Sequence, residues 1–395
     1  MKKWWGGLLV ILTILTVYVS YTFLRPLELN PIHVADHPLS AQPLKTMSVG
    51  INRGAIGYIN PEDGSIHCRA LGSYTTPHPT ASIAKLITVQ VVLDHKTPAG
   101  GLASEIVTMT ADDEARYWQT VASGGSNVKV VTGEQFSLKQ IIEGILLASA
   151  NNMADSLAIW AFGSLDNYFV VANQWLEQHN LYDTVVGGDA SGFSSLTKST
   201  PTDLCKITLQ ATKNPALAEI LSEAEATMPS GEVIKTTNRL LGQNGVFAGK
   251  TGYTDEAGRG VVVASHQNIS GIDMTLAAVS LGNDSYDTAF TTASHLITGV
   301  AQDVNVWLID KGTDLGEISS RWGSISSIST SHQVVIPYWV DQPPAVTVRV
   351  NYPDSDSLSK HSIIGQLVID DSVVNLIATS GVKSASLWWR FTHPF

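Results

Sequence analysis

The chain has few charged residues, and basic residues are the scarcer kind. Of its 395 residues only 15% are charged, with 24 Lys and Arg against 35 Asp and Glu, so the formal net charge is −11. Phosphate backbones are bound by clustered Lys and Arg, and the chain contains no basic run. We therefore expect no nucleic acid among its partners.

Cysteine is almost absent, with only Cys68 and Cys205 in the whole chain. Two thiols do not make a disulfide framework, and neither has a second cysteine at the spacing of metal ligands. The two could pair with each other. Their apolar flanks favour the alternative that both are small buried side chains.

Charge is missing altogether from residues 4–24, "WWGGLLVILTILTVYVSYTFL", which follow Lys2 and Lys3. This apolar run is long enough to cross a bilayer as a helix, and it has tryptophans near one end and tyrosines near the other. We predict a signal-anchor helix over residues 1–25, with the bulk of the chain on the extracytoplasmic side of the cell membrane. The alternative is a signal peptide that is cleaved.

The composition and the hydrophobic periodicity of the sequence indicate three further regions. Residues 26–45 contain four prolines and read as a linker. Residues 46–302 run from strands, with a hairpin signal at "NPEDG", through helical periodicity after Ser137 to strands again, which predicts an α+β domain with a helical lobe inserted in an antiparallel sheet. Residues 303–395 contain short β-rich runs and predict a small all-β domain, ending in a strand or in an aromatic contact with membrane or wall.

The segment "TASIAKLITV", residues 80–89, places Ser82 and Lys85 three positions apart at the start of an apolar run. If a helix begins near Ser82, both side chains lie on one face, and a desolvated lysine could take the proton of the serine hydroxyl. The helix start would also direct free N–H groups at an oxyanion. Alone, the pair also fits an ordinary surface serine and lysine.

Two later segments add to this pair. Ser149-Ala150-Asn151 ends an apolar helical run, where it could cap the helix or could supply a hydroxyl and an amide to a substrate. Lys250-Thr251-Gly252 follows a strand-like run, where it could be a simple turn or an edge strand that binds an extended peptide.

Ser-x-x-Lys, Ser-x-Asn and Lys-Thr-Gly, in this order, are the set used by penicillin-binding proteins and class A β-lactamases. The chain resembles the low-molecular-mass penicillin-binding proteins, the serine-type D-alanyl-D-alanine carboxypeptidases, over roughly residues 46–300. Beyond the three motifs, the resemblance extends to "LLASANNMADSLA", "STPTDL" (199–204) and "TTNRLLGQNGVFAGKTGYTDEAG" (236–258). It implies a β-lactamase-like fold. It also implies that residues 303–395 correspond to the family's C-terminal β-domain.

The resemblance also implies an activity: removal of the terminal D-alanine from peptidoglycan stem peptides, with β-lactam antibiotics as inhibitors. Matching positions would give Ser82 as the acylated nucleophile, Lys85 as its base, and Ser149 in proton transfer. Substrate would be bound by Asn151, Lys250, Thr251, Gly252 and Tyr253, with the N–H groups of Ser82 and Tyr253 as the oxyanion hole. No metal or cofactor is implied, and no histidine lies in a His-Glu-x-x-His pattern.

The sequence departs from the family at three places. Ala150 stands where glycine is usual, and Ala84 replaces a hydroxyl residue. "NDSYDTAF", residues 283–290, is acidic where the family often has a basic stretch thought to hold the substrate carboxylate. Arg259 could compensate, although an exposed strand arginine is the simpler interpretation.

Other functions stay open. A β-lactamase would need a glutamate for the deacylating water, and none of the glutamates between the second and third motifs lies in a Glu-x-x-Leu-Asn-like loop. A catalytically inactive wall-binding protein of the same fold is a second alternative. Cleavage of cross-links, an endopeptidase activity, is a third.

Overall fold

The fold is known from a computed structural model, which describes residues 2–30, 33–34, 51, 53–72, 75–351, 356–370 and 372–393. The chain forms two compact units. One ends at Asn305, and the other combines the N-terminal residues with those from Val306 onward. Most of the predicted linker 26–45 lies outside the described residues.

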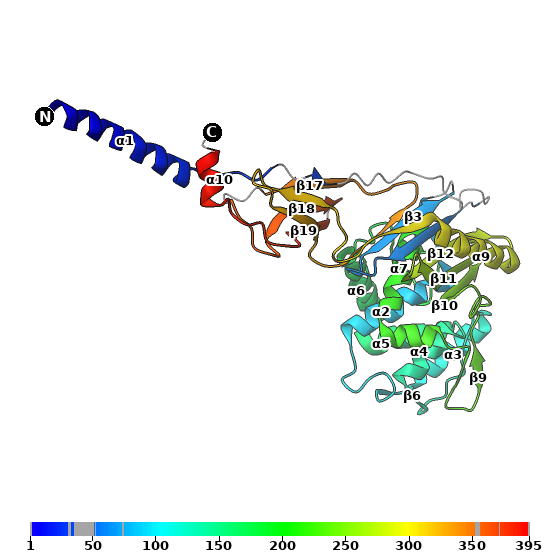
Figure 1. The fold of residues 1–395 in the computed structure, drawn as a ribbon. Coiled ribbons are helices and arrows are strands. Elements are labelled where there is room, and N and C mark those ends of the chain that lie inside the picture. The colour runs from blue at the N-terminus through cyan, green and yellow to red at the C-terminus, as the bar shows by residue number, and fades with distance from the viewer. Residues whose placement is uncertain are drawn as a thin grey trace. The chain divides into compact units, whose positions relative to one another are not determined.

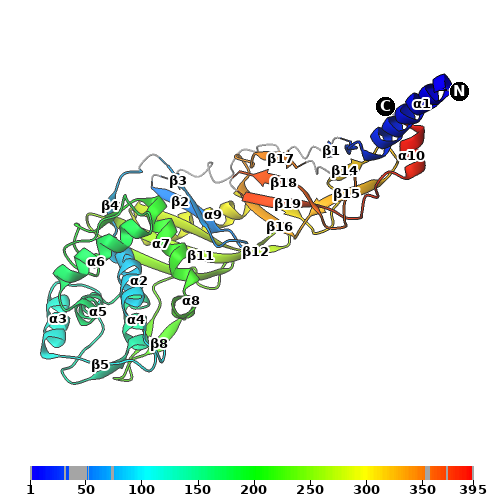
Figure 2. The ribbon, with the colours of Figure 1, turned by 90° about the vertical axis from the view of Figure 1, so that its left-hand side faces the viewer.

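The first unit contains a five-stranded antiparallel sheet in the order β10-β11-β12-β2-β3 (Figures 1 and 2). The predicted hairpin is present, because Asn60 N–H donates to Ser65 O across the turn between β2 and β3 at 2.8 Å. The three long strands come from the segment predicted to return to the sheet. The bounds are β2 Gly54–Ile59, β3 Ile66–Leu71, β10 Val246–Thr254, β11 Gly258–Ile269 and β12 Ile272–Asn283.

Two helices, α7 (Pro201–Lys213) and α9 (Tyr286–Asp303), cover the two faces of this sheet. In β2, residues three apart face opposite sides. A Cβ at Gly54 would meet Leu296 of α9, and a Cβ at Gly57 would collide with the sulfur of Cys205 on α7. Glycine at position 57 therefore lets α7 approach the sheet closely, whereas a Cβ at Gly54 would make only an ordinary contact with α9.

Cys68 of β3 and Cys205 of α7 form a disulfide with a Cα–Cα distance of 6.2 Å. The prediction of two free buried thiols was wrong. The flanking residues indicated burial correctly, but only the packing of α7 across β2 and β3 brings the two sulfur atoms together.

Reduction of this disulfide is expected to lower the free energy of unfolding by about 2–4 kcal/mol. The reason is that the intact disulfide closes a long loop and so restricts the unfolded chain. The bridged residues are 137 positions apart. Thermal unfolding with and without dithiothreitol measures the effect. The double variant Cys68→Ser, Cys205→Ser serves as control and should not respond to the reductant; an equal response in both proteins would contradict the prediction.

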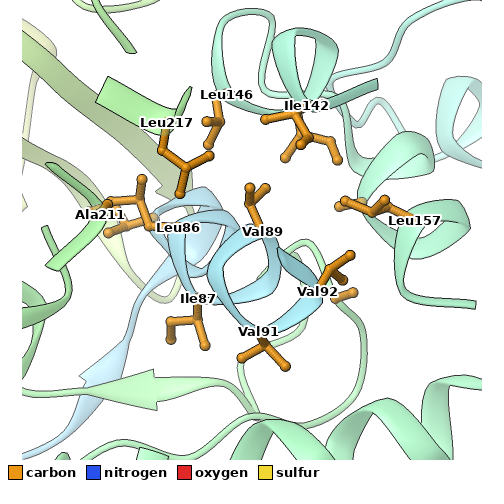
Figure 3. Packing of buried hydrophobic residues seen from close by; sticks show 14 of the residues in the cluster. Leu86, Ile87, Val89, Val91, Val92, Ile142, Leu146, Leu157, Ala211 and Leu217 are labelled. Atoms are coloured by element: carbon orange, nitrogen blue, oxygen red, sulfur yellow. The ribbon is translucent and has the colours of Figure 1, made fainter. Parts of the chain in front are cut away.

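The helical lobe is inserted between β3 and β10, as predicted, and α2 (Lys85–His95) runs through its centre. Residues 85–93 of α2 are all buried. Figure 3 shows Leu86, Val89 and Val92 directed at side chains of α4, α5 and α8, among them Ile142 and Leu157. Burying each aliphatic side chain contributes about 1.5–3 kcal/mol, so this helix is held from every side.

One predicted continuous helical run, residues 137–163, is divided into α4 and α5 at Leu147–Ala150. Ser137 caps α4, as expected, with its side chain accepting from Gln140 N–H. The remaining elements of this unit are α3 Ala111–Ala122, α4 Leu138–Leu146, α5 Asn151–Phe162, α6 Leu165–Gln178, α8 Pro215–Leu221, the 3₁₀ turn η2 Ala81–Ala84, and the short strand pairs β4 His78–Pro79 with β7 Lys198–Ser199, β5 Ile106–Thr108 with β6 Gln135–Ser137, and β8 Glu225–Thr227 with β9 Val233–Lys235.

The second unit is built on a six-stranded sheet, β1-β14-β15-β19-β18-β17, and the pair β13-β16. The sequence predicted β13, β16, β17, β18 and β19 but not the serine-rich β14 and β15. The bounds are β1 His33–Val34, β13 Val304–Ile309, β14 Gly316–Ser319, β15 Ile325–Thr330, β16 Val334–Trp339, β17 Val346–Val350, β18 Ile363–Ile369 and β19 Ser372–Ala378.

The residues after the N-terminal helix join this sheet. Leu29 is buried in its core, Asn30 N–H donates to Ser319 O at 2.8 Å, and β1 pairs with β14. This part of residues 26–45 is therefore not the free tether that the prolines suggested, because its backbone completes the edge of the sheet.

The N-terminal helix α1 spans Lys2–Leu24, and its segment Gly7–Leu24 has a mean hydropathy of 2.1 with 6% of it buried. The C-terminal residues form a helix, α10 (Leu387–Thr392), capped by Ser386, so the favoured prediction of a final strand was wrong. Arg390 of α10 donates to the carbonyl oxygens of Phe23 and Arg25 at the end of α1.

Candidate active site

Ser82 and Lys85 are brought together by the 3₁₀ turn that precedes α2. In such a turn the side chains at i and i+3 eclipse each other, and Lys85 Nζ donates to Ser82 Oγ at 2.7 Å. Ala81 enters the turn at φ +47°, a conformation that non-glycine residues seldom adopt. The predicted helix start is thus present, with the serine on the tighter turn and the lysine at the first α-helical position.

Lys85 is fully buried, at 0% relative exposure. Burial disfavours its charged form and lowers its pKa to about 7, although the carboxylates of Asp189 and Asp155 act in the opposite direction. Its amine also donates to Asn151 Oδ1 at 2.7 Å and to the Ser191 carbonyl at 3.0 Å. An ammonium has three donors, so loss of one proton leaves a lone pair that can accept from the Ser82 hydroxyl.

The second motif occupies the break between α4 and α5. Ser149 stands at φ +61°, and Asn151 is the first residue of α5, with its N–H donating to Ser126 O at 2.7 Å. This geometry directs the Ser149 hydroxyl toward Lys250 and the Asn151 amide toward Lys85. Asn152, the next residue, hydrogen-bonds Val128 instead and supports the wall of the lobe.

The third motif lies on β10, which is an edge strand of the described sheet, as the β-augmentation interpretation expected. Lys250 Nζ donates to Ser149 Oγ at 2.8 Å, and Thr251 Oγ1 donates to Thr237 Oγ1 at 2.8 Å. Burial lowers the pKa of Lys250, and the nearby charge of Lys85 lowers it further. A protonated Lys85 thus disfavours protonation of Lys250.

Gly252 allows the strand to approach the nucleophile turn. A Cβ there would lie 2.9 Å from Thr80 O and 3.1 Å from Ile83 N, tighter than atoms tolerate. The glycine requirement is therefore one of space. Tyr253 follows with its side chain 42% exposed and its hydroxyl donating to Asp255 at 2.6 Å.

These segments line one groove of about 1100 Å³. Six of the eight predicted site residues face it, and the two lysines are buried behind it. The lining residues are Ser82, Gly124, Gly125, Ser126, Ser149, Asn151, Phe193, Thr237, Thr251, Gly252, Tyr253, Thr254, Asp255, Glu256 and Tyr286.

The sequence did not predict the turn at residues 189–194. The Ser191 carbonyl in this turn accepts the third hydrogen bond of the Lys85 amine. Asp189 accepts from the N–H groups of Ser191, Phe193 and Ser194, and Asp155 on α5 accepts from Ala190 N–H at 2.8 Å. The signal was present in "DASGFS", where an aspartate precedes small residues that can turn back on it.

Arg259 was considered as a holder of the substrate carboxylate. Its guanidinium lies over the Tyr253 ring, 4.2 Å from the centroid, and donates to the Asp284 carbonyl at 2.6 Å. It does not line the groove. Within the described residues, no group of three or more His, Cys, Asp or Glu side chains could hold a metal ion.

The sequence profile of the D-alanyl-D-alanine carboxypeptidase family, peptidase family S11, matches residues 71–285, which is more than half of the chain and includes all three motifs. The chain belongs to this family. A curated relative, D-alanyl-D-alanine carboxypeptidase DacB2 of Mycobacterium tuberculosis, is 32% identical over 196 residues, which cover 48% of this chain and 62% of the relative. The matched part therefore spans about three fifths of that protein's length.

Two further comparisons cover more of the chain. A D-alanyl-D-alanine endopeptidase of Pseudomonas aeruginosa is 25% identical over 282 residues, covering 67% of this chain and 81% of the relative. The crystal structure of penicillin binding protein 6B from Escherichia coli superposes with a TM-score of 0.62 at 21% identity, over 88% of this chain and 99% of that one. This match extends the shared fold into the C-terminal β-rich unit, and the predicted fold class is confirmed.

Proposed function

We propose that this member of the family is a serine D-alanyl-D-alanine carboxypeptidase that forms an acyl-enzyme at Ser82. The observation that carries the proposal is the contact of 2.7 Å between Ser82 Oγ and a fully buried amine whose pKa is lowered to about 7. A serine hydroxyl needs such a base to become a nucleophile at neutral pH.

These contacts support the following reaction. Neutral Lys85 accepts the Ser82 proton as Oγ attacks the carbonyl carbon of the penultimate D-alanine, and the oxyanion is bound by the N–H groups of Ser82 and Tyr253. Ser149, hydrogen-bonded to Lys250, delivers a proton to the departing amine of the last D-alanine. The proton that Lys85 has taken replaces the one that Ser149 gives up, so both groups return to their starting states. Water then attacks the ester and passes one proton to Lys85 and from it to Ser82 Oγ as the acyl bond breaks, and the shortened peptide leaves with the water oxygen in its new carboxylate.

Binding of the substrate is assigned to the groove along β10. The peptide lies as an extended strand against the free edge of β10, and the Asn151 amide and the groove-facing Thr251 bind its polar groups. Gly252 keeps this strand close to the turn that carries Ser82. The proposed substrate is the peptidoglycan stem peptide, and β-lactam antibiotics, whose strained amide resembles its scissile bond, are the expected inhibitors.

The decisive experiment incubates the protein with a synthetic pentapeptide that ends in D-Ala-D-Ala. The full chain is used in detergent, or the chain without residues 1–25 if that form is shown to fold. Mass spectrometry should show loss of one alanine. Cleavage of a cross-linked muropeptide dimer in preference to the pentapeptide would favour the endopeptidase alternative. Absence of both reactions and of penicillin labelling would favour an inactive wall-binding protein.

A β-lactamase is the less favoured alternative. The glutamates between the second and third motifs are Glu177, Glu219, Glu223, Glu225 and Glu232, and none of these is among the residues that line the groove. The acyl-enzyme formed with penicillin is therefore expected to persist, and rapid turnover of penicillin would contradict this assignment.

We further propose that α1 anchors the protein in the cell membrane and that the chain after α1 lies on the extracytoplasmic side. The length and hydropathy of Gly7–Leu24 support a span, and Lys2 and Lys3 precede it. The contacts of Arg390 with Phe23 and Arg25 favour a retained helix over a cleaved signal peptide. The disulfide agrees with an oxidising compartment.

A further inference from the structure

The Lys85 amine has one hydrogen-bond acceptor that belongs to none of the three motifs. This acceptor is the Ser191 carbonyl oxygen, 3.0 Å from Nζ, in the turn at residues 189–194. If Lys85 is the base of the reaction, the groups that hold this carbonyl in place also orient the base. The charged groups beside it decide when the amine can accept a proton.

The residue before this carbonyl, Ala190, is bound at both of its peptide groups. Its N–H donates to Asp155 Oδ1 on α5 at 2.8 Å, and its carbonyl oxygen accepts from Thr88 Oγ1 on α2 at 2.6 Å. The Thr88 hydroxyl has a single proton, so the Tyr168 hydroxyl is the donor in the 2.8 Å contact between these two side chains. The turn is therefore fastened to the two helices that carry Lys85 and Asn151.

Asp155 lies on the same face of α5 as Asn151, since the two are four residues apart. The helix thus directs an amide at the Lys85 amine and a carboxylate at the turn that binds the same amine. A neutral oxygen would also satisfy the Ala190 N–H. The negative charge of Asp155 is therefore not required by this hydrogen bond, and its effect on Lys85 is electrostatic.

Ionisable side chains from four other elements act on Asp155. Burial has the largest effect and raises the pKa of its carboxyl to about 6, so the group is mostly ionised at neutral pH. The Asp189 carboxylate also raises this pKa, whereas Lys85 and Arg116 of α3 lower it. Tyr168 of α6 contributes no charge, because burial raises the pKa of its phenol.

An ionised Asp155 favours the protonated form of Lys85. Burial lowers the pKa of this amine, and the carboxylates of Asp189 and Asp155 oppose that effect. Asp189 also accepts three backbone N–H groups of its own turn, so the turn depends on it. Asp155 is thus the carboxylate whose charge can be removed while an acceptor for the turn is kept.

We propose, on the function proposed above, that Asp155 is a positioning residue of the reaction. It fastens the turn at residues 189–194 against the Lys85 amine, and its negative charge keeps a proton on that amine until the pH approaches neutrality. The charge thereby sets the lower pH limit of acylation. A neutral acceptor at position 155 keeps the geometry and extends acylation to more acidic pH.

The test measures the rate of acylation by a fluorescent penicillin from pH 5 to pH 9, with the full chain in detergent. Asp155→Asn keeps an oxygen for the Ala190 N–H and removes the charge. The pH of half-maximal rate should fall by about 0.5 to 1, at the lower end of the effect of a nearby opposite charge. The rate at pH 5.5 should then be about 3- to 10-fold higher than in the wild type, and the rate at pH 8.5 should agree within about twofold.

Two further variants separate the charge from the shape of the side chain. Asp155→Glu keeps the charge and should keep the wild-type pH of half-maximal rate. Asp155→Ser is a second neutral variant, and it should share the lower pH of half-maximal rate even if its rate is reduced at every pH. Thermal unfolding establishes that each variant is folded.

Asp166→Asn is the matched control, because Asp166 is exposed at the start of α6 and does not line the groove. Its rate and pH profile should equal those of the wild type. An unshifted profile in folded Asp155→Asn and Asp155→Ser, with or without a uniform loss of rate, would leave Asp155 a structural role and overturn the inference alone. Failure of both neutral variants to fold would assign the charge to the fold and would also overturn it. A wild type that is not acylated at any pH and leaves the D-Ala-D-Ala pentapeptide intact would instead overturn the proposed function.

Discussion

Ser82→Ala is expected to abolish the covalent adduct with penicillin and to lower carboxypeptidase activity by at least about 10⁴-fold. The Ser82 hydroxyl oxygen is the protein atom to which the proposed reaction attaches the acyl group, so its removal leaves no route to an acyl-enzyme. Intact-protein mass spectrometry after incubation with penicillin measures the adduct directly. The pentapeptide assay measures the activity.

The control is Ser104→Ala. Ser104 is an exposed serine whose hydroxyl donates to Gly101 O, and it does not face the groove. This variant should acquire the adduct like the wild type. An adduct of unchanged stoichiometry in Ser82→Ala would assign the nucleophile to another residue and would remove the basis of the mechanism.

The second large effect concerns Lys85. Lys85→Arg keeps the positive charge but cannot release a proton near neutral pH, and Lys85→Met removes the amine while keeping an unbranched side chain. Both variants should acylate about 10²- to 10⁴-fold more slowly than the wild type, the usual contribution of a positioned base. Thermal unfolding of both variants separates loss of the base from loss of the fold.

The pH dependence of the acylation rate tests the same role of Lys85 in the wild type. Lys85 accepts a proton only in its neutral form, and its pKa is lowered to about 7 by burial. The acylation rate should therefore rise with pH through about 7 and fall about tenfold per pH unit below it, so that the rate at pH 5 is about 100-fold lower. Because Lys250 is buried nearby, the observed pKa belongs to the pair of amines.

Lys213→Arg is the control for the lysine variants, since Lys213 is exposed and donates only to Gly64 O among the described contacts. Its rate and profile should match those of the wild type. A wild-type rate that stays flat from pH 5 to 9, or a Lys85→Met protein that folds and acylates at the wild-type rate, would show that another group takes the Ser82 proton.

The three motifs were predictable because each is local. Ser82 and Lys85 are three residues apart, and the turn geometry of a helix start is enough to bring their side chains together. The hairpin of β2 and β3, the cap at Ser137 and the buried character of α2 likewise depend on neighbours in the sequence.

The errors have a common cause. Cys68 and Cys205 looked like separate buried residues, and the disulfide exists because α7 crosses the sheet beside β3. The serine-rich β14 and β15 lack a strong strand pattern, and their pairing partners decide their conformation. The C-terminal aromatics read as a strand, yet a serine cap and contacts with the end of α1 accompany a helix.

By itself the sequence determined the family, the order of the three motifs and the types of group available for catalysis, since these depend on residue identity and short spacing. Only the tertiary structure decided that two lysines become buried together, that Asp155 and the turn at 189–194 support one of them, and that Tyr286 reaches the groove. Desolvation and proximity between distant segments set the pKa values and the hydrogen bonds of a site, and both arise only when the chain has folded.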